Sequence, residues 1–174
     1  MSNCIVAQSG GPTSVINATV AGIVRANQLN PIYTKVYGGL HGIEGILQEM
    51  LVDLTAMSDE ENRILRQTPA SALGSCRYKL KRENEADFIR LLEVMEKYDV
   101  ETLFYTGGND SMDTVFALSE YAQKKGITNR RFVGCPKTVD NDLMVTDHCP
   151  GFGSAAKFIS TTALQTWLDV NVYT

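Results

Sequence analysis

Histidine is scarce in this sequence, and the cysteines do not occur in closely spaced pairs. The 174-residue chain has two histidines and four cysteines, and only His148 and Cys149 are adjacent. Structural zinc sites use four such ligands grouped at short intervals, so the composition argues against a zinc centre. Cysteines within apolar segments, such as Cys4 and Cys135, are typical of free thiols in a reducing compartment. We therefore expect a cytoplasmic protein.

Long hydrophobic runs and a strong net charge are also missing. No apolar run approaches the roughly 20 residues that span a bilayer, and the N-terminal sequence MSNCIVAQSGG lacks the basic start and cleavage site of a signal peptide. The formal net charge is −4, with 44% apolar and 21% charged residues. This composition is typical of globular proteins and gives no basic surface for nucleic acid. We expect one domain over residues 1–174, without a membrane or nucleic-acid partner.

The sequence does contain short apolar runs that alternate with helical patterns. Apolar residues at helical spacing from Val15 to Val24 predict the first helix. Strands are expected at residues 3–8, 32–37, 100–106 and 132–135, and further helices around residues 88–95, 115–122 and 155–168. The polar segment between residues 55 and 84 is expected to be irregular. The last residues, LDVNVYT, resemble the start of a strand and predict that the chain is a fragment of a longer protein.

Strands that alternate with helices of this length predict an α/β fold with a mostly parallel sheet. Right-handed crossovers place the C-terminal ends of such strands at one edge, and open α/β sheets bind ligands at that edge. Each of four glycine-containing or polar segments follows an expected strand: SGGPTS, GGLHG, GGNDS and PKTVDND. We therefore expect these segments to meet in one site.

The segment SGGPTS has two adjacent glycines before an expected helix. Gly10 and Gly11 can adopt positive φ and let a ligand approach the backbone, and Pro12 suits the first turn of the helix. Free backbone N–H groups at a helix N-terminus attract anions. The segment indicates either a phosphate-binding loop or a plain tight turn, and by itself it does not decide between them.

The segment GGNDS repeats this arrangement with a carboxylate in the loop. Gly107 and Gly108 follow an apolar run, and the loop continues with Asn109, Asp110 and Ser111. Similar glycine–acid loops occur in NAD kinases and lipid kinases, so the segment alone does not select a substrate. Because both glycine loops lie at one edge of the expected sheet, each supports the other as a phosphate site.

The segment PKTVDND places a lysine beside two carboxylates. Lys137 can neutralise phosphate oxygens. One of the carboxylates Asp140 and Asp142 can accept a proton from an attacking hydroxyl, and the other can orient substrate or hold a metal. If the segment is extended, these two residues and Thr138 lie on one face. A solvated acidic loop is the alternative, but the spacing favours phosphoryl transfer.

Two further segments carry positive charge. The basic run in LGSCRYKLKR indicates either a solvated face or a cationic patch that holds a polyanion. Arg77 directly follows a turn-like stretch, and we expect it to reach inward. In GFGSAAKF, Ser154 is the expected N-cap of the last helix. Lys157 lies in the first turns, where a nearby anion would offset its unfavourable interaction with the helix dipole. A plain exposed lysine is the alternative.

Together these segments resemble the phosphofructokinases. The stretches SGGPTSVIN, GGLHGI, LGSCRYK, GGNDS, PKTVDNDL and GFGSAAKF occur in the order of that family and at similar spacing. They extend over nearly the whole chain. The resemblance implies a Rossmann-like three-layer sandwich with a mostly parallel sheet, in which residues 1–174 form the N-terminal lobe of a two-lobed enzyme. It also implies that the full-length protein is a homo-oligomer.

The resemblance implies a role for each segment. Asp140 would deprotonate the 1-hydroxyl of fructose 6-phosphate, with Lys137 as the second catalytic residue. Thr138 and Asp142 would contact the sugar. The phosphoryl donor would be bound by Gly11, Arg77, Gly107, Gly108, Asp110 and Ser111. Mg²⁺ would bridge the donor and the protein, as phosphoryl transfer generally requires, with Asn109 at the metal position.

Two positions separate the donors used within this family. ATP-dependent members typically have glycine at the positions of Asp110 and Lys137, whereas diphosphate-dependent members resemble this sequence at both. The Asp110 carboxylate would repel the α-phosphate of a nucleotide, and Lys137 would supply positive charge to diphosphate. We therefore predict a diphosphate-dependent 6-phosphofructokinase that forms fructose 1,6-bisphosphate reversibly. ATP as the donor is the alternative.

Asn109 departs from the family pattern, which usually has aspartate there in association with the metal. An asparagine oxygen can bind Mg²⁺ but contributes no charge. Either the metal would then bind more weakly, or Asp110 or Asp113 would take part in its place. This substitution is the one feature that favours a different class of protein, a non-catalytic sensor of phosphate or nucleotide.

Overall fold

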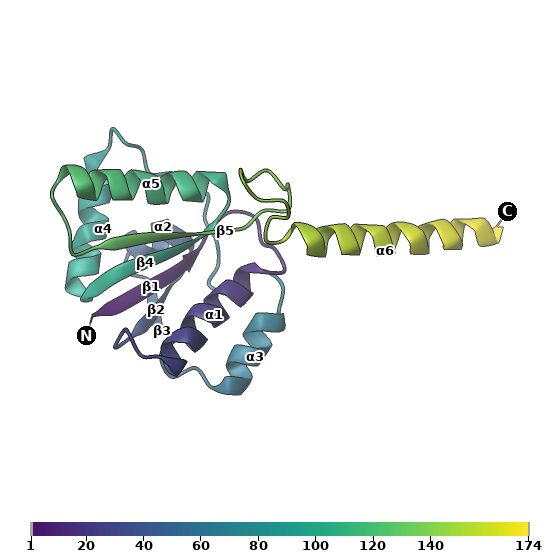
Figure 1. Cartoon of the computed structure of the whole chain (residues 1–174), viewed down its shortest axis with the longest axis horizontal. Helices are drawn as coiled ribbons and strands as arrows, with labels where there is room; N and C mark the ends of the chain where they lie inside the picture. Colours follow the sequence, from purple (N-terminus) through teal and green to yellow (C-terminus); the bar gives the residue numbers. More distant parts are fainter. Residues whose placement is uncertain (1, 174) are drawn as a thin grey trace.

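The structure, a computed structural model, describes residues 2–173 and has three layers with one projecting helix (Figure 1). The strands are β1 (Asn3–Gln8), β2 (Val36–Gly39), β3 (Leu51–Asp53), β4 (Val100–Gly107) and β5 (Arg131–Pro136). The helices are α1 (Ile16–Leu29), α2 (Gly42–Leu47), α3 (Asp59–Gln67), α4 (Glu85–Lys97), α5 (Asn109–Lys124) and α6 (Phe152–Val170), followed by a 3₁₀ turn (Asn171–Tyr173). The predicted α/β class is confirmed.

The central strand β1 belongs to a five-stranded sheet with the order β3-β2-β1-β4-β5. It pairs in parallel with β2 and β4, and β4 pairs in parallel with β5, whereas the edge strand β3 runs antiparallel to β2. The chain moves outward from β1 in one direction and then returns to start β4 on its other side. Because β1, β4 and β5 are parallel neighbours, the loops that follow them begin side by side at one edge of the sheet. Open parallel sheets bind ligands at such a switch point.

Successive side chains of β1 enter two different hydrophobic clusters, as the alternation of a strand requires. Cys4 and Val6 belong to the cluster under α1 and α3. Ile5 and Ala7 belong to the cluster under α2, α4 and α5. Figure 1 shows α1 and α3 on one side of the sheet and α4 and α5 on the other. The expected three-layer sandwich is confirmed.

Several expectations for residues 32–84 were wrong. The second strand starts at Val36 rather than residue 32, and it includes two glycines that were expected in a loop. The segment expected to be irregular contains α3. The Ser58 hydroxyl accepts a hydrogen bond from the Glu61 N–H at 3.2 Å, and the Glu61 carboxylate accepts one from the Ser58 N–H at 2.8 Å. This capping box is visible in the sequence as Ser-x-x-Glu and was the signal for α3.

The last helix, α6, projects away from the three layers (Figure 1). The expectation of a strand in LDVNVYT was wrong for its described residues, because the helix and the 3₁₀ turn continue to Tyr173, and Thr174 lies outside them. The N-cap is Gly151, with φ of 106°, rather than Ser154. None of the α6 residues is buried. Among the described residues, no helix combines the length and the apolar character needed to cross a membrane.

Candidate active site

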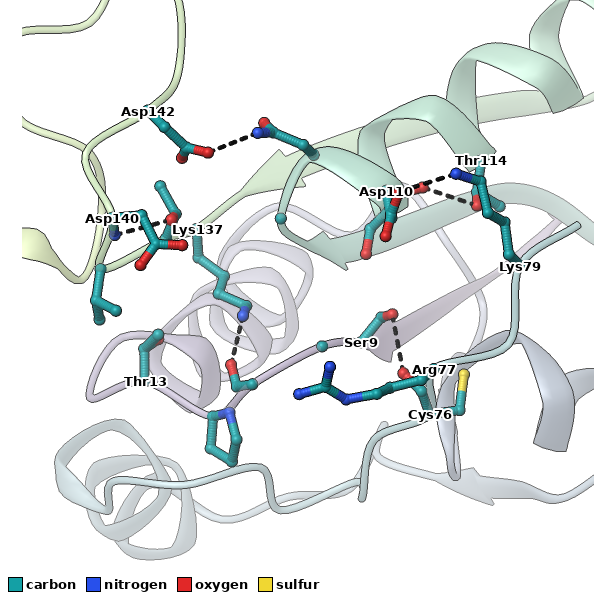
Figure 2. A pocket seen from close by; sticks show the side chains of 18 of the residues that line it. Ser9, Thr13, Cys76, Arg77, Lys79, Asp110, Thr114, Lys137, Asp140 and Asp142 are labelled. Atoms are coloured by element: carbon teal, nitrogen blue, oxygen red, sulfur yellow. Dashed lines mark hydrogen bonds and ion pairs between the residues drawn. The ribbon is translucent and has the colours of Figure 1, made fainter.

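The C-terminal ends of β1, β4 and β5 surround a cavity of about 680 Å³ (Figure 2). Its walls come from the loop after β1, the segment 76–79, the first turns of α5 and the loop after β5. Ten predicted site residues line it: Gly11, Arg77, Gly108, Asn109, Asp110, Ser111, Lys137, Thr138, Asp140 and Asp142. Gly107 and the GGLHG segment do not line this cavity. Three of the four segments therefore converge as the parallel topology predicted, and the expectation for GGLHG was wrong.

The loop after β1 presents its backbone to the cavity. Gly10 has φ of 76°, and a Cβ atom there would lie 3.4 Å from the Nζ atom of Lys137. Gly11 does not have a positive φ, and a Cβ atom there would meet nothing within 4 Å. Helix α1 begins only at Ile16, so the placement of Pro12 in its first turn was wrong. The positive charge beside this loop comes from a side chain, Lys137.

Lys137 is a buried cation in the cavity wall, with only 5% of its surface exposed. Its Nζ atom donates a hydrogen bond to the carbonyl oxygen of Gly11. Burial lowers the pKa of Lys137, and the charge of Arg77 lowers it further, while Asp140 acts in the opposite direction. The charged form is therefore penalised in the free protein, and an anion bound beside Nζ would remove that penalty.

Gly107 shapes the cavity without facing it. This residue is buried at the end of β4, and a Cβ atom there would lie 2.0 Å from the Oγ atom of Ser111. A side chain at this position would therefore displace the first turn of α5. The Gly107 carbonyl accepts a hydrogen bond from the Lys137 N–H at 2.9 Å. The position of Gly107 indicates a packing role rather than the expected direct contact with a donor.

The PKTVDND segment turns rather than running extended. The N–H of Asp140 donates to the Oγ1 atom of Thr138 at 3.0 Å, and Asn141 has a positive φ of 56°. The expectation that alternation would place three side chains on one face was therefore wrong. The turn nevertheless brings Thr138, Asp140 and Asp142 to the cavity. Within residues 2–173, the exposed carboxylate of Asp140 accepts no hydrogen bond, so its oxygens are free to receive a proton.

Two contacts join the first turn of α5 to neighbouring segments. The Nδ2 atom of Asn109 donates to the Oδ2 atom of Asp142 at 2.7 Å. The Nζ atom of Lys79 lies 3.0 Å from the Oδ1 atom of Asp110. Because the Asp110 side chain is 86% exposed, this ion pair stabilises the fold little. Figure 2 shows Asp110 with Lys79 and, on the opposite side of the cavity, Asp140 with Lys137.

Arg77 lines the cavity and points inward, as the sequence predicted (Figure 2). Lys79 and Thr13 also line it. Lys79 was considered only as part of the basic run, and Thr13 was not identified from the sequence. The alternation of Arg77 and Lys79 before the buried Leu80 was an available signal for the lysine. The hydroxyl of Thr13 is buried and has no hydrogen-bond partner among the described residues, and no sequence pattern marks that property.

The GFGSAAKF segment does not form the anion site expected there. Neither Ser154 nor Lys157 lines the cavity, and Lys157 is exposed on α6. Gly151 instead forms an isolated bridge with Thr138, so the segment braces the loop after β5. The alternative interpretation of Lys157, as an exposed lysine, agrees with the structure.

The protein side chains do not by themselves form a complete magnesium site, and Mg²⁺ commonly takes its remaining ligands from substrate phosphates and water. Over residues 2–173, no group of three or more histidine, cysteine, aspartate or glutamate side chains is placed to hold a metal ion. Asp113, one of the expected replacement ligands, lies 2.7 Å from Arg82 and does not line the cavity. Arg82 holds the pKa of Asp113 below its ordinary value. Asp110 is paired with Lys79, and the amide N–H of Asn109 faces a carboxylate.

Comparison with known proteins gives consistent results. Over 171 residues the chain is 46% identical to the pyrophosphate–fructose 6-phosphate 1-phosphotransferase of Halomonas elongata, covering 97% of this chain and 41% of that protein. It is 31% identical over 166 residues to an ATP-dependent 6-phosphofructokinase of Glaesserella parasuis, covering 94% and 45%. The chain thus spans about two fifths of the length of the curated relatives it matches.

A solved structure agrees in fold as well as in sequence. The pyrophosphate-dependent phosphofructokinase of Marinobacter aquaeolei superposes with a TM-score of 0.88 at 45% identity, covering 98% of this chain and 42% of that one. The phosphofructokinase family model matches residues 3–167. With the parallel sheet, the convergent glycine loops and the lysine–aspartate cavity, these matches show that the chain belongs to the phosphofructokinase family.

Proposed function

We propose that this chain is the donor-binding N-terminal lobe of a cytoplasmic enzyme that transfers a phosphoryl group from diphosphate to the 1-hydroxyl of fructose 6-phosphate. The observation that carries the proposal is the buried ammonium of Lys137 in the cavity wall, with Asp110 on the opposite side. Lys137 forms no salt bridge among the described residues, and a buried ammonium without a salt bridge favours an anionic ligand. The higher identity to a relative named for pyrophosphate, 46% against 31% for one named for ATP, supports diphosphate as the donor.

The residues suit an in-line phosphoryl transfer. The sugar 1-hydroxyl oxygen attacks one phosphorus of diphosphate, the bond from that phosphorus to the bridging oxygen breaks, and orthophosphate leaves with the bridging oxygen. Asp140 accepts the hydroxyl proton, because its carboxylate is exposed and engaged in no hydrogen bond among the described residues. Lys137 and Arg77 stabilise the negative charge on the phosphoryl groups. Thr138 and Asp142 contact the sugar.

The charge of the cavity rim, rather than the cavity volume, discriminates between diphosphate and ATP. A cavity of about 680 Å³ is within the usual range for small-molecule sites, so its volume does not exclude a nucleotide. The Asp110 carboxylate at the rim is only weakly compensated, since its ion pair with Lys79 is exposed to solvent. A nucleotide would have to place its α-phosphate beside this carboxylate, whereas diphosphate ends before reaching it.

The first test uses a full-length enzyme that contains these residues, because the relatives are longer than this chain. Turnover of fructose 6-phosphate is measured in the presence of Mg²⁺ with diphosphate or ATP. We expect the wild type to turn over fructose 6-phosphate with diphosphate and not with ATP. The Asp110→Gly variant should gain ATP turnover, because the repulsive carboxylate is gone, and we expect a gain of about tenfold or more over the wild-type background.

Asp113→Gly is the matched control for this test. It removes a carboxylate from the same helix and also introduces glycine, but Asp113 lies outside the cavity and pairs with Arg82. Donor choice should therefore not change. Wild-type turnover with ATP and none with diphosphate would contradict the proposal. No turnover with either donor, with binding retained in Asp140→Asn, would instead support the phosphate sensor, which Asn109 favours.

A further inference from the structure

Asn109 and Asp142 connect two loops that have different expected tasks. Asn109 is the first residue of α5, next to the glycines of the donor loop, and Asp142 lies 33 positions later in the sugar-binding segment. The contact between the Nδ2 atom of Asn109 and the Oδ2 atom of Asp142, at 2.7 Å, crosses between them. Both side chains line the cavity. A displacement of one loop therefore directly alters this hydrogen bond to the other loop.

The chemistry of this contact requires a hydrogen-bond donor at position 109, which the asparagine amide supplies. A carboxylate accepts hydrogen bonds and does not donate them when ionised, so Asp142 needs a donor opposite it. An aspartate at position 109 would place two negative charges at this distance, which raises the energy of both ionised forms. The asparagine therefore supplies the hydrogen-bond donor that the Asp142 carboxylate needs.

The rest of the loop around Asp142 is fixed by its own backbone and by Asn141. The Asn141 side chain donates to the carbonyl oxygen of Asp147 at 3.2 Å and accepts from the Cys149 N–H at 2.9 Å. These bonds hold the turn together but do not touch the Asp142 carboxylate. Among the described residues, Asn109 is the one side chain that hydrogen-bonds to that carboxylate.

We propose that Asn109 is a positioning residue for the sugar side of the reaction: from the donor loop, it orients the Asp142 carboxylate toward fructose 6-phosphate. The inference rests on the function proposed above. It assigns Asn109 to the acceptor rather than to the donor or its metal. A residue of the donor loop would then contribute to binding of the sugar rather than of diphosphate.

The test is steady-state kinetics of the full-length enzyme carrying Asn109→Ala, with each substrate varied in turn. We expect the KM for fructose 6-phosphate to rise by about five- to tenfold, the loss of one hydrogen bond to a charged group. The KM for diphosphate should change by less than about twofold, because the variant keeps the glycine backbone and the cationic side chains of the donor site. A merely structural lesion would not separate the two constants in this way.

Asn109→Asp gives a second, independent readout. Two facing carboxylates share a proton as the pH falls, because one of their pKa values is raised by the other. The ratio of the variant KM for fructose 6-phosphate to the wild-type KM should therefore decrease from pH 8 to pH 6. Asn129→Ala is the matched control, since Asn129 is exposed and lies outside the cavity, and both constants should remain at wild-type values.

The outcomes distinguish the inference from the proposed function. A wild-type enzyme without turnover from diphosphate and fructose 6-phosphate would overturn both. Wild-type turnover with a raised KM for diphosphate and an unchanged KM for the sugar in Asn109→Ala would overturn the inference alone and assign the residue to the donor. Unchanged constants for both substrates would also overturn it.

Discussion

At the scale of single residues, the buried lysine predicts how donor binding depends on pH. The pKa of Lys137 is lowered in the free protein by burial and then by Arg77. Bound diphosphate adds negative charge nearby and raises this pKa, so the protonated lysine binds the donor more tightly than the neutral one. Affinity should therefore be full below the free-protein pKa and should fall as the pH rises through it. Calorimetric titration of the full-length enzyme with diphosphate from pH 7 to pH 10 measures this dependence.

Lys137→Met is the comparison that isolates the lysine, because diphosphate itself also titrates and does so equally in both proteins. The variant should bind diphosphate about tenfold or more weakly at pH 7, the loss of a charge-assisted contact. Its affinity should follow only the ionisation of the ligand. Parallel pH profiles for wild type and variant would mean that Lys137 stays fully charged throughout, or that it does not contact the donor.

Residue types in the sequence predicted which side chains share the cavity, but not how they pair. Lys137, Asp140 and Asp110 could be identified because charged residues follow strands at one edge of a parallel sheet. The contact of Asn109 with Asp142 could not, because it depends on the turn at Asn141, whose positive φ is not encoded in a simple alternation. Hydrogen-bond partners follow from the path of the backbone, and sequence spacing indicates that path only within regular elements.

At the scale of elements, Glu49 joins the turn after α2 to helix α4. Its carboxylate accepts hydrogen bonds from Arg90 at 2.8 Å and from the Tyr98 hydroxyl at 3.0 Å, and it is also paired with Lys97. The hydrogen bond from Lys97, followed by that from Arg90, lowers the pKa of Glu49 to about 2. Because the carboxylate has a lower pKa when folded, its stabilisation is complete above the ordinary value of 4.5 and is lost as the pH falls through about 2.

Glu49→Gln tests this connection, because the amide keeps the shape and removes the charge. The variant should melt a few degrees below the wild type at pH 7, and the difference should shrink toward zero near pH 2. Thermal unfolding followed by circular dichroism at several pH values measures it. Glu93→Gln serves as the control. The Glu93 side chain is 60% exposed, and its carboxylate lies 3.5 Å from the Arg90 guanidinium, farther than the 2.8 Å of Glu49. Its effect should therefore be small. A pH-independent difference for Glu49→Gln would contradict the electrostatic origin.

The elements also show where sequence patterns fail. Strands β1, β4 and β5 were predicted within about two residues, because continuous apolar runs bounded by turns are typical of buried parallel strands. The short antiparallel β3 was missed because three residues, LVD, carry no periodicity. The helix α3 was missed because its composition is polar, with Asn62 its one buried residue, although the capping box marked its start. The position of α3 is fixed by its packing against α1 rather than by its local sequence pattern.

At the scale of the whole molecule, α6 leaves an apolar stripe without a partner. Phe158, Ile159 and Trp167 lie on one side of the helix and are 71%, 63% and 61% exposed. A large exposed apolar surface on a helix generally marks an interface. The chain covers 41% of the Halomonas elongata relative. In a full-length enzyme of that size, the additional residues can cover the stripe. We expect a protein consisting of residues 1–174 alone to self-associate by packing this stripe against the same stripe of a second copy.

Light scattering coupled to size-exclusion chromatography tests this on the 174-residue protein. The wild type should elute as a dimer or larger species, and the double variant Phe158→Glu/Trp167→Glu should be monomeric, because two charges cannot be buried in an apolar contact. Lys157→Glu puts a new acid on the opposite side of α6 and should leave the association intact. Diphosphate affinity should be equal in all three proteins, because no α6 residue lines the cavity. A monomeric wild type would show that the exposed stripe is tolerated in water and would contradict this prediction.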